Sequence, residues 1–446
     1  MTGRYKSYPE YKKSGIEWVG DIPSTWEVKP TFSVFDPSTV KNVDGKEAVV
    51  LSLSYGNIIK RDVEKNFGLL PESFNTYQIV NDGDLILRLT DLQNDKKSLR
   101  VGQAKQRGII TSAYLKLRST DIIEPSFAYR LLHSYDTTKV FYGMGGGLRQ
   151  SMKFEDFRRL PIVLPSIKEQ QKIASFLDHE TAKIDTLIAK QEKLIELLKE
   201  KRQAVISHAV TKGLNPDAPM RDSGVEWLGE VPEHWEISSL KYFASIQGGY
   251  AFNSNEFVDT GVQILRIGNV YQNRLALERQ PTFVSDTLYN QLPEFRVIKG
   301  DILMSLTGTL GKRDYGFAVK VDREGRYLLN QRVAKLAPVS QKITRSFLLN
   351  VLWSESYLTQ LYALPSGTKQ ANLSNSDLLR IIVAVPPSKS EQQEIAIYVE
   401  EKLAKIDNLT ELATEAIELM KERKTALISA AVTGKIDVRD WKPQGV

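Results

Sequence analysis

The sequence predicts an α+β fold: two tandem globular α/β domains are separated by two long helices packed as an antiparallel coiled coil, with pseudo-twofold symmetry. The first observation behind this prediction is a run of strong helix formers at residues 165–213, which opens on Pro-Ser and stops at a Gly. The second is a similar run from Pro387, which repeats Glu-Gln-Gln, Ile-Asp, Lys-Glu and Ala-Val-Thr at a constant offset of 222 residues, as Glu169 and Glu391 illustrate. The third is a short Trp-containing segment that precedes each domain.

The Trp-containing segment reads SGIEWVGDIPSTW at residues 14–26 and returns as SGVEWLGEVPEHW at residues 223–235. Both copies keep their two Trp residues beside Gly and Pro turns, which is typical of side chains that pack against a core. We therefore expect these residues to anchor the segment rather than to stack on bases; they are Trp18, Trp26, Trp227 and Trp235.

Short alternating apolar runs, separated by Gly, Asn and Asp, predict the strands of a mixed domain in each half. They are Ala48–Leu53, Leu85–Leu89, Ile109–Leu117, Gln263–Ile267 and Ile302–Leu306. Each half then ends in an apolar strand between prolines, LPIVLP or IIVAVP. The predicted boundaries are 1–160 for the first domain, 161–213 for the central long helix, 214–385 for the second domain, 386–434 for the distal long helix and 435–446 for a C-terminal tail.

Both long helices carry a narrow apolar seam flanked by Lys and Glu, the pattern of a helix that pairs with one other long helix. A helix of about 40 residues spans roughly 60 Å, so the pair would hold two domains a fixed distance apart. The residues predicted to pack in the seam are Ile173, Leu177, Ile184, Leu187, Leu194, Leu198 and Val205 in the first helix, and Ile395, Val399, Ile406, Leu409, Met420 and Leu427 in the second.

Composition sets the outer limits. A chain of 446 residues exceeds one ordinary core, and 41% hydrophobic with 26% charged residues is typical of globular proteins. No apolar run approaches the roughly 20 residues needed to cross a bilayer, and the polar N-terminus shows no export signal. The absence of cysteine fits a cytoplasmic protein without disulfides, and a net charge of +6 permits a polyanionic partner.

Two similar domains at a fixed separation suit a ligand that also has two spaced features. Double-stranded DNA is such a ligand, because half-sites on one face recur about every 34 Å and a twofold protein meets them in inverted orientation. The divergence between the two domains then has a use, since each domain would read a different half-site.

Candidate DNA contacts follow from side-chain chemistry. The segment 139–159 combines three consecutive glycines with basic and amide residues, and its counterpart in the second half is also rich in amides. Arg, Asn and Gln can form paired hydrogen bonds with base edges, whereas Lys mostly binds phosphate. The alternative for both loops is a solvated connection. The candidates there are Arg149, Gln150, Lys153, Lys369, Gln370 and Asn372.

A further set of polar residues elsewhere in the two domains could also contact DNA, although an ordinary surface role is the simpler reading of each. They are Asn57, Arg88, Arg107, Arg266, Asn269, Arg313, Asn330, Gln331 and Arg332.

We find no catalytic, cofactor-binding or metal-binding residues. The four histidines are scattered with no second ligand at i+3 or i+4, which argues against a zinc site. The stretch GTLGKR is too short for a phosphate loop, and GMGGG lacks the strand-then-helix context of a dinucleotide fingerprint. The sequence therefore predicts a non-catalytic chain.

The paired WxGxxPxxW segments, the two Gly-x-x-x-Gln loops before an apolar strand, and the paired EQQ...KID...AVT helices resemble the DNA-specificity subunit of type I restriction-modification systems. The resemblance covers essentially the whole chain. It implies a non-enzymatic subunit whose two target-recognition domains read a bipartite target on double-stranded DNA. It also implies two methyltransferase subunits that use S-adenosylmethionine for adenine methylation, and two restriction subunits that use ATP and Mg²⁺. Residues 169–211 and 391–433 would then be spacer helices and part of the docking surface.

Two other classes of function remain open at this point. A stand-alone enzyme acting on nucleic acid would need nucleotide or metal motifs, and activity of the isolated chain on DNA would support it. A coiled-coil adaptor that binds only proteins would show balanced Lys and Glu faces on its helices and no DNA sequence preference.

Overall fold

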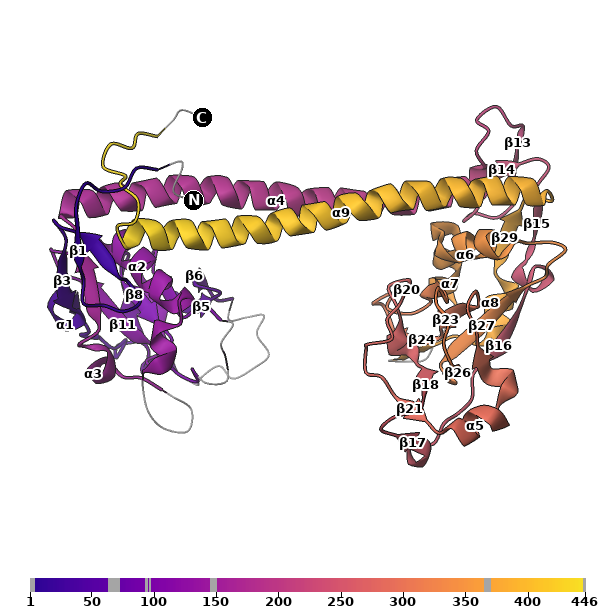
Figure 1. The fold of residues 1–446 in the computed structure, drawn as a ribbon, viewed down its shortest axis with the longest axis horizontal. Helices are drawn as coiled ribbons and strands as arrows, with labels where there is room; N and C mark the ends of the chain where they lie inside the picture. The colour runs from indigo at the N-terminus through magenta and orange to yellow at the C-terminus, as the bar shows by residue number, and fades with distance from the viewer. Residues whose placement is uncertain are drawn as a thin grey trace. The chain divides into compact units, whose positions relative to one another are not determined.

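The structure, a computed structural model, describes residues 5–62, 73–92, 95, 98–144, 151–364 and 370–443. The chain divides into two compact units (Figure 1). Unit 1 comprises residues 1–192 with 415–446, and unit 2 comprises residues 193–414. Two long helices, α4 (Ile167–Lys212) and α9 (Lys389–Val432), each contribute one part to each unit.

Unit 1 is built around a four-stranded antiparallel sheet of order β4-β11-β8-β9, with α2 packed against it. A second pair, β12 with β3, joins the end of the domain to its beginning. The elements are β1 (Tyr11–Lys13), β2 (Asp21–Pro23), β3 (Glu27–Pro30), α1 (Thr31–Val34), β4 (Phe35–Asp36), β5 (Leu51–Ser54), β6 (Asn57–Lys60), β7 (Gln78–Val80), β8 (Leu85–Leu87), β9 (Val101–Gln103), β10 (Gly108–Ile110), β11 (Leu115–Ser119), α2 (Pro125–Thr137), η1 (Val140–Gly143), α3 (Phe154–Phe157) and β12 (Pro161–Leu164).

Unit 2 repeats this plan with a larger strand content. A sheet of order β16-β27-β23-β25 carries α6, and a five-stranded sheet of order β17-β21-β18-β26-β22 adds to it. The elements are β13 (Met220–Asp222), β14 (Glu230–Pro232), β15 (Glu236–Ser239), η2 (Leu240–Tyr242), β16 (Ala244–Gly248), η3 (Ser254–Glu256), β17 (Phe257–Val258), β18 (Val262–Leu265), η4 (Ile267–Asn269), β19 (Val270–Tyr271), β20 (Arg274–Leu275), β21 (Phe283–Val284), α5 (Asp286–Gln291), η5 (Pro293–Phe295), β22 (Arg296–Val297), β23 (Ile302–Ser305), β24 (Thr307–Thr309), β25 (Ala318–Lys320), β26 (Tyr327–Leu329), β27 (Val333–Pro338), α6 (Arg345–Trp353), α7 (Glu355–Ala363), β28 (Gln370–Asn372), α8 (Asn375–Arg380) and β29 (Ile382–Val385).

The apolar strands between prolines are confirmed as β12 and β29, which pair antiparallel with β3 and β15. The expected strand Ile109–Leu117 is instead two strands, β10 and β11, because a turn closes where Tyr114 N–H donates to Thr111 O at 3.2 Å. Residues 435–443 of the expected C-terminal tail pack in unit 1, where the Trp441 ring meets Phe176 edge-on at 5.4 Å.

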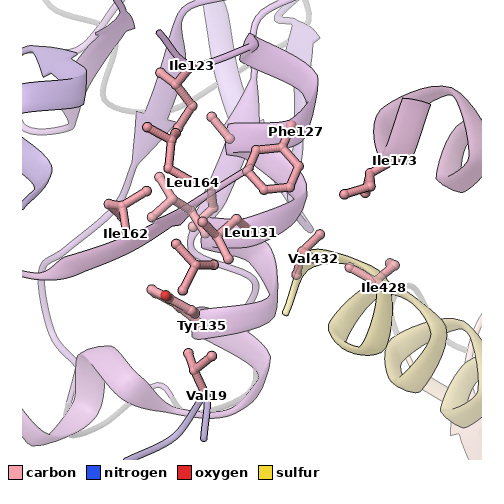
Figure 2. Packing of buried hydrophobic residues seen from close by; sticks show 14 of the residues in the cluster. Val19, Ile123, Phe127, Leu131, Tyr135, Ile162, Leu164, Ile173, Ile428 and Val432 are labelled. Atoms are coloured by element: carbon pink, nitrogen blue, oxygen red, sulfur yellow. The ribbon is translucent and has the colours of Figure 1, made fainter. Parts of the chain in front are cut away.

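The core of unit 1 unites the domain with both long helices. Figure 2 shows Phe127 and Leu131 of α2 beside Ile173 of α4 and Val432 of α9, all of them buried. Helix α2 is amphipathic, and its apolar face fills the space between the sheet and the helix pair. The domain and the helices therefore share one hydrophobic core.

The two helices run antiparallel, because the first part of α4 packs with the last part of α9 in unit 1, and the converse holds in unit 2. Equivalent ion pairs link them: Asp185 to Lys424 at 2.6 Å in unit 1, and Asp407 to Arg202 at 2.7 Å in unit 2. Both aspartates belong to the repeated Ile-Asp pair, so this part of the repeat serves helix pairing.

The predicted seam is correct at its ends and wrong in its middle. Leu187, Leu194 and Leu409 are 49%, 40% and 49% exposed. The error is one of spacing. We expected the seam residue after Ile184 to be Leu187, three positions on, but the residue that packs is the half-buried Ile188, four positions on. The other seam residues are buried or half-buried: Ile173, Leu177, Ile184, Leu198, Val205, Ile395, Val399, Ile406, Met420 and Leu427.

Candidate nucleic-acid interface

Each domain is fixed to its long helix by the first Glu of the EQQ motif. In unit 1, Glu169 Oε1 accepts hydrogen bonds from Trp26 Nε1 at 3.0 Å and from the Tyr8 hydroxyl at 2.6 Å. In unit 2, Glu391 Oε1 accepts from Trp235 Nε1 at 2.9 Å. The Trp side chains need this acceptor because an indole N–H buried without a partner loses a hydrogen bond to water.

Only half of the expected Trp anchors are buried. Trp26 and Trp235 lie in the core, at 0% and 1% exposure, which confirms the prediction for them. Trp18 and Trp227 are exposed, at 42% and 44%. The second Trp therefore anchors each segment in the core, whereas the first Trp lies at the protein surface.

The side chain of the Gln that follows also joins the domain to the helix, and all of its partners are backbone groups. Gln170 Oε1 accepts from the backbone N–H of Glu124, the N-cap residue of α2, at 2.7 Å. Its Nε2 donates to the carbonyl oxygens of Ile122 at 3.0 Å and Pro165 at 2.9 Å. This buried side chain therefore ties the start of α2 to the start of α4.

Gln392 repeats the arrangement in unit 2. Its Oε1 accepts from the N–H of Thr344, the N-cap residue of α6, at 2.6 Å, and its Nε2 donates to Lys342 O and Pro386 O, both at 2.8 Å. Sequence reasoning used the EQQ motif only as part of the repeat. A Gln at the start of each long helix is the one signal in the sequence for this role. Its partners cannot be predicted from the sequence, because they are backbone groups that only the fold brings close.

In unit 2 the structure brings several predicted contact residues together on one ribbon. Strand β28 pairs with β24, so that Gln370 lies opposite Thr309 and Asn372 opposite Thr307. Ala371 between them is buried, while Gln370 and Asn372 are exposed on the other face. An exposed two-stranded ribbon with amide side chains is a form that fits the major groove of DNA.

The turn at residues 330–332 lies beside this ribbon. Leu306 N–H donates to Arg332 O at 3.0 Å, and Leu373 N–H donates to Leu306 O at 2.9 Å, which joins the three segments. Gln331 and Arg332 are exposed, and Asn330 is half-buried with its Oδ1 accepting from Arg332 N–H at 3.4 Å. The cluster of Gln370, Asn372, Gln331 and Arg332 is the candidate interface of unit 2, and we call it the ribbon cluster.

A cavity of about 480 Å³ lies next to the ribbon, lined by Thr307, Gln370, Tyr271 and Phe317 among others. The hydroxyl of Thr307 is buried without a hydrogen-bond partner in the described part of the chain. An open, partly aromatic pocket therefore adjoins the ribbon at Gln370.

Three other predicted contacts of unit 2 are not part of the ribbon cluster. Asn269 is only 1% exposed and its amide closes a turn, donating to Ala276 O and Arg279 O at 3.0 Å, so the prediction that it contacts DNA is wrong. Arg266 is exposed and bonds Thr282 Oγ1 at 3.1 Å. Arg313 pairs with Glu355 at 3.4 Å.

In unit 1 the candidates are spread over several loops. Lys153 is exposed at the start of α3, and Asn57 is exposed at the turn between β5 and β6. Arg88 is half-buried just beyond β8, and Arg107 is exposed and paired with Glu47 at 3.0 Å. Three predicted contacts, Arg149, Gln150 and Lys369, lie outside the described residues.

Arg100 is a residue that the sequence analysis missed. Its side chain is fully buried and its guanidinium donates to the carbonyl oxygens of Thr90 at 2.8 Å, Asp91 at 3.3 Å and Asp95. Its backbone N–H donates to the carboxylate of Asp136 at 2.6 Å, a group whose pKa burial raises to about 6. This single cation organises the segment that follows Arg88.

The described ranges contain neither a candidate metal site nor a candidate membrane-spanning helix. No group of three His, Cys, Asp or Glu side chains there could hold a metal ion. None of the described helices combines the length and the apolar character that crossing a bilayer requires.

Comparison with known proteins places these features in one family. The profile of the "Type I restriction modification DNA specificity domain" matches residues 105–197 and 232–419. The chain is 28% identical over 435 residues to the type I restriction enzyme MjaVIII specificity subunit of Methanocaldococcus jannaschii, covering 94% of this chain and 95% of that protein. It is 24% identical to the putative MjaX specificity subunit of the same organism, covering 96% and 97%.

Solved structures show the same fold. A structure described as the basis of complex assembly and conformational transition of the type I R-M system matches with a TM-score of 0.68 and 15% identity, covering 92% of this chain and 98% of that one. The HsdS subunit of Thermoanaerobacter tengcongensis matches with a TM-score of 0.51 and 15% identity, covering 93% and 98%.

Proposed function

This chain belongs to the type I restriction-modification DNA specificity family, and we propose that its two domains each read one half of a bipartite target on double-stranded DNA. The observation that carries the proposal is that the family match falls on both halves of the chain, each with its own joint to a long helix. The chain supplies sequence recognition and leaves the chemistry to partner subunits.

Base reading in the second domain falls to the ribbon cluster. Gln370 and Asn372 can pair with two edge atoms of adenine, and Arg332 can do the same with guanine. In the first domain Lys153 and Asn57 are exposed, and Arg149 and Gln150 belong to the same proposal on chemistry alone. The two sets differ in residue type and position, so the two half-sites differ in sequence.

The chemistry belongs to partners in this proposal. Two methyltransferase subunits carry S-adenosylmethionine, and two restriction subunits carry ATP and Mg²⁺. A duplex target also accounts for the excess of positive charge, because contacts to phosphate supply much of the affinity of DNA-binding proteins.

Selection from random duplexes tests the DNA-reading proposal. The complex of this chain with methyltransferase subunits is expected to enrich two short blocks separated by unselected positions. Replacing Gln370 and Asn372 by Ala should weaken the preference at one block about tenfold or more, because each paired contact contributes about 1–3 kcal/mol. The matched control is Gln393→Ala, an exposed residue on α9.

Two results would count against the proposal. Enrichment of no sequence at all would favour a protein-binding adaptor. An equal loss at both blocks in the double variant would show that the ribbon cluster does not read one half-site.

The helix pair offers the docking surface for two copies of one partner. Unit 1 exposes Leu187 of α4 and Leu419 of α9, and unit 2 exposes their equivalents, Leu409 of α9 and Leu197 of α4. Exposed leucines at matching places on paired helices suit an apolar helix of a partner. Each unit therefore binds one methyltransferase subunit in this proposal.

Native mass spectrometry checks the docking surface. The variant Leu197→Asp is expected to bind one methyltransferase subunit where the unaltered chain binds two, and Leu197→Asp with Leu419→Asp should bind none. The control Lys199→Ala changes an exposed polar residue on the same helix. Binding of two subunits by the double variant would exclude these leucines from the interface.

A further inference from the structure

Unit 2 contains a cavity of about 300 Å³ between α6 and the two long helices. Its walls include the apolar side chains of Leu349, Trp353, Val399 and Leu403, together with Asn350 and Glu400. Arg202 and Asp407 also line it, but they are paired with each other at 2.7 Å. The remaining lining residues are Ser346, Ala396, Ala404 and the exposed Lys320.

The repeat within the chain shows what fills the equivalent place in unit 1. Arg130 lies six residues after the N-cap Glu124 of α2, as Asn350 lies six residues after the N-cap Thr344 of α6. The guanidinium of Arg130 binds Asp178 at 2.8 Å and Thr181 Oγ1 at 3.3 Å.

The acid that receives this arginine is kept in the second half. Asp178 corresponds to Glu400 at the same offset of 222 residues that relates Glu169 to Glu391. Unit 2 thus retains the carboxylate but has a short amide where unit 1 has an arginine. The cavity therefore lies at the place in unit 2 that corresponds to the Arg130 side chain in unit 1.

Two polar groups in this cavity have unused hydrogen-bonding capacity. Asn350 is only 5% exposed, and its side chain has no hydrogen-bond partner among the residues that the structure describes. Glu400 is exposed, and within the same ranges it forms neither an ion pair nor a hydrogen bond. Both groups can therefore accept hydrogen bonds from a ligand that supplies donors.

We infer that this cavity receives an arginine side chain presented by a partner protein that docks on the long helices. A guanidinium offers five donors in a planar fork, which suits the Glu400 carboxylate and the Asn350 amide oxygen together. The apolar walls accept the aliphatic stem, and the Trp353 ring offers a surface for the cation. The inference rests on the proposed function, in which a methyltransferase subunit docks on the long helices.

The first test uses the full chain labelled with 5-fluorotryptophan. The chain has six Trp residues, and Trp353→Phe identifies the resonance of Trp353. Titration with N-acetyl-arginine methylamide is expected to shift that resonance saturably, while the citrulline analogue, which has the same shape without the charge, should not. Glu400→Gln should weaken the shift at least tenfold. No saturable shift, or an equal shift with citrulline, overturns the inference.

The second test fills the cavity with an arginine side chain of the chain itself. Asn350→Arg would recreate in unit 2 the pair that Arg130 forms in unit 1, and it should abolish the response to the arginine compound. It should also weaken binding of the methyltransferase subunit about tenfold or more, as should Glu400→Gln, with Gln393→Arg as the control on α9. Unchanged binding by both variants overturns the inference. Failure of the proposed function would be seen separately, as a loss of DNA sequence preference.

Discussion

Replacing Glu169 by Ala is expected to lower the free energy of unfolding of unit 1 by about 3–6 kcal/mol. One carboxylate oxygen serves two donors, Trp26 Nε1 and the Tyr8 hydroxyl, and each hydrogen bond to a charged group contributes about 1.5–3 kcal/mol. Burial raises the pKa of Tyr8, and the hydrogen bond to Glu169 raises it further, so the hydroxyl stays protonated and remains a donor. The variant leaves both donors without an acceptor.

Hydrogen exchange of residues 5–26, measured at increasing urea concentration, reports this effect within unit 1. Gln171→Ala is the control, because Gln171 is the exposed third residue of the EQQ motif and its loss should change stability by less than about 0.5 kcal/mol. Glu169→Gln keeps an acceptor oxygen and should fall between the two. Equal stability of Glu169→Ala and Gln171→Ala would show that the joint does not hold the domain.

The equivalent change in unit 2 should cost less. Glu391 accepts from the buried Trp235, but its second oxygen faces the exposed ring of His234 at 2.9 Å, which water can solvate after the change. Only one buried donor is then left without a partner. The difference between the stability losses of Glu169→Ala and Glu391→Ala therefore reports the contribution of the second buried donor, the Tyr8 hydroxyl.

The fold could be predicted from the sequence largely because the two halves of the chain are an internal repeat. The repeated Ile-Asp pair, the Trp-containing segments and the strands between prolines each appear at matching places, and a repeat is visible without knowing any contact. The seam register could not be resolved in the same way. Leu187 and Ile188 are both apolar, and only packing against the facing helix decides that Ile188 turns inward.

The candidate site was harder to predict, because its residues are defined by distant partners. Asn269 has the right chemistry for adenine, yet its side chain closes a turn by binding three backbone groups. Gln170 and Arg100 have no motif that marks them, since they bind main-chain carbonyls brought close only by the fold. The sequence predicted Gln370 and Asn372 as candidate contacts from their amide side chains in a loop, whereas their place on β28 on either side of the buried Ala371 comes from the structure.

Exchanging residues 30–160 for the matching segment of another family member is expected to change one half of the DNA target and leave the other intact. Sequencing of methylated DNA from cells that express the chimeric complex measures the target. The preference for the original half-site should fall about 10³-fold or more, the smallest usual ratio between specific and non-specific binding. A change in both halves would contradict the assignment of one half-site to each domain.

The structure explains why such an exchange should fold. Gln170 binds the incoming segment only through its main chain, at Ile122 O and Glu124 N–H, so the donor needs the same backbone path and not the same side chains. Trp26 and Glu169, which form the other part of the joint, lie outside the exchanged residues. The donor must still present an apolar α2 face, because Phe127 and Leu131 share the core with the long helices (Figure 2). A donor with a polar residue at either place should fail to assemble whatever its target, which separates a folding failure from a change in DNA recognition.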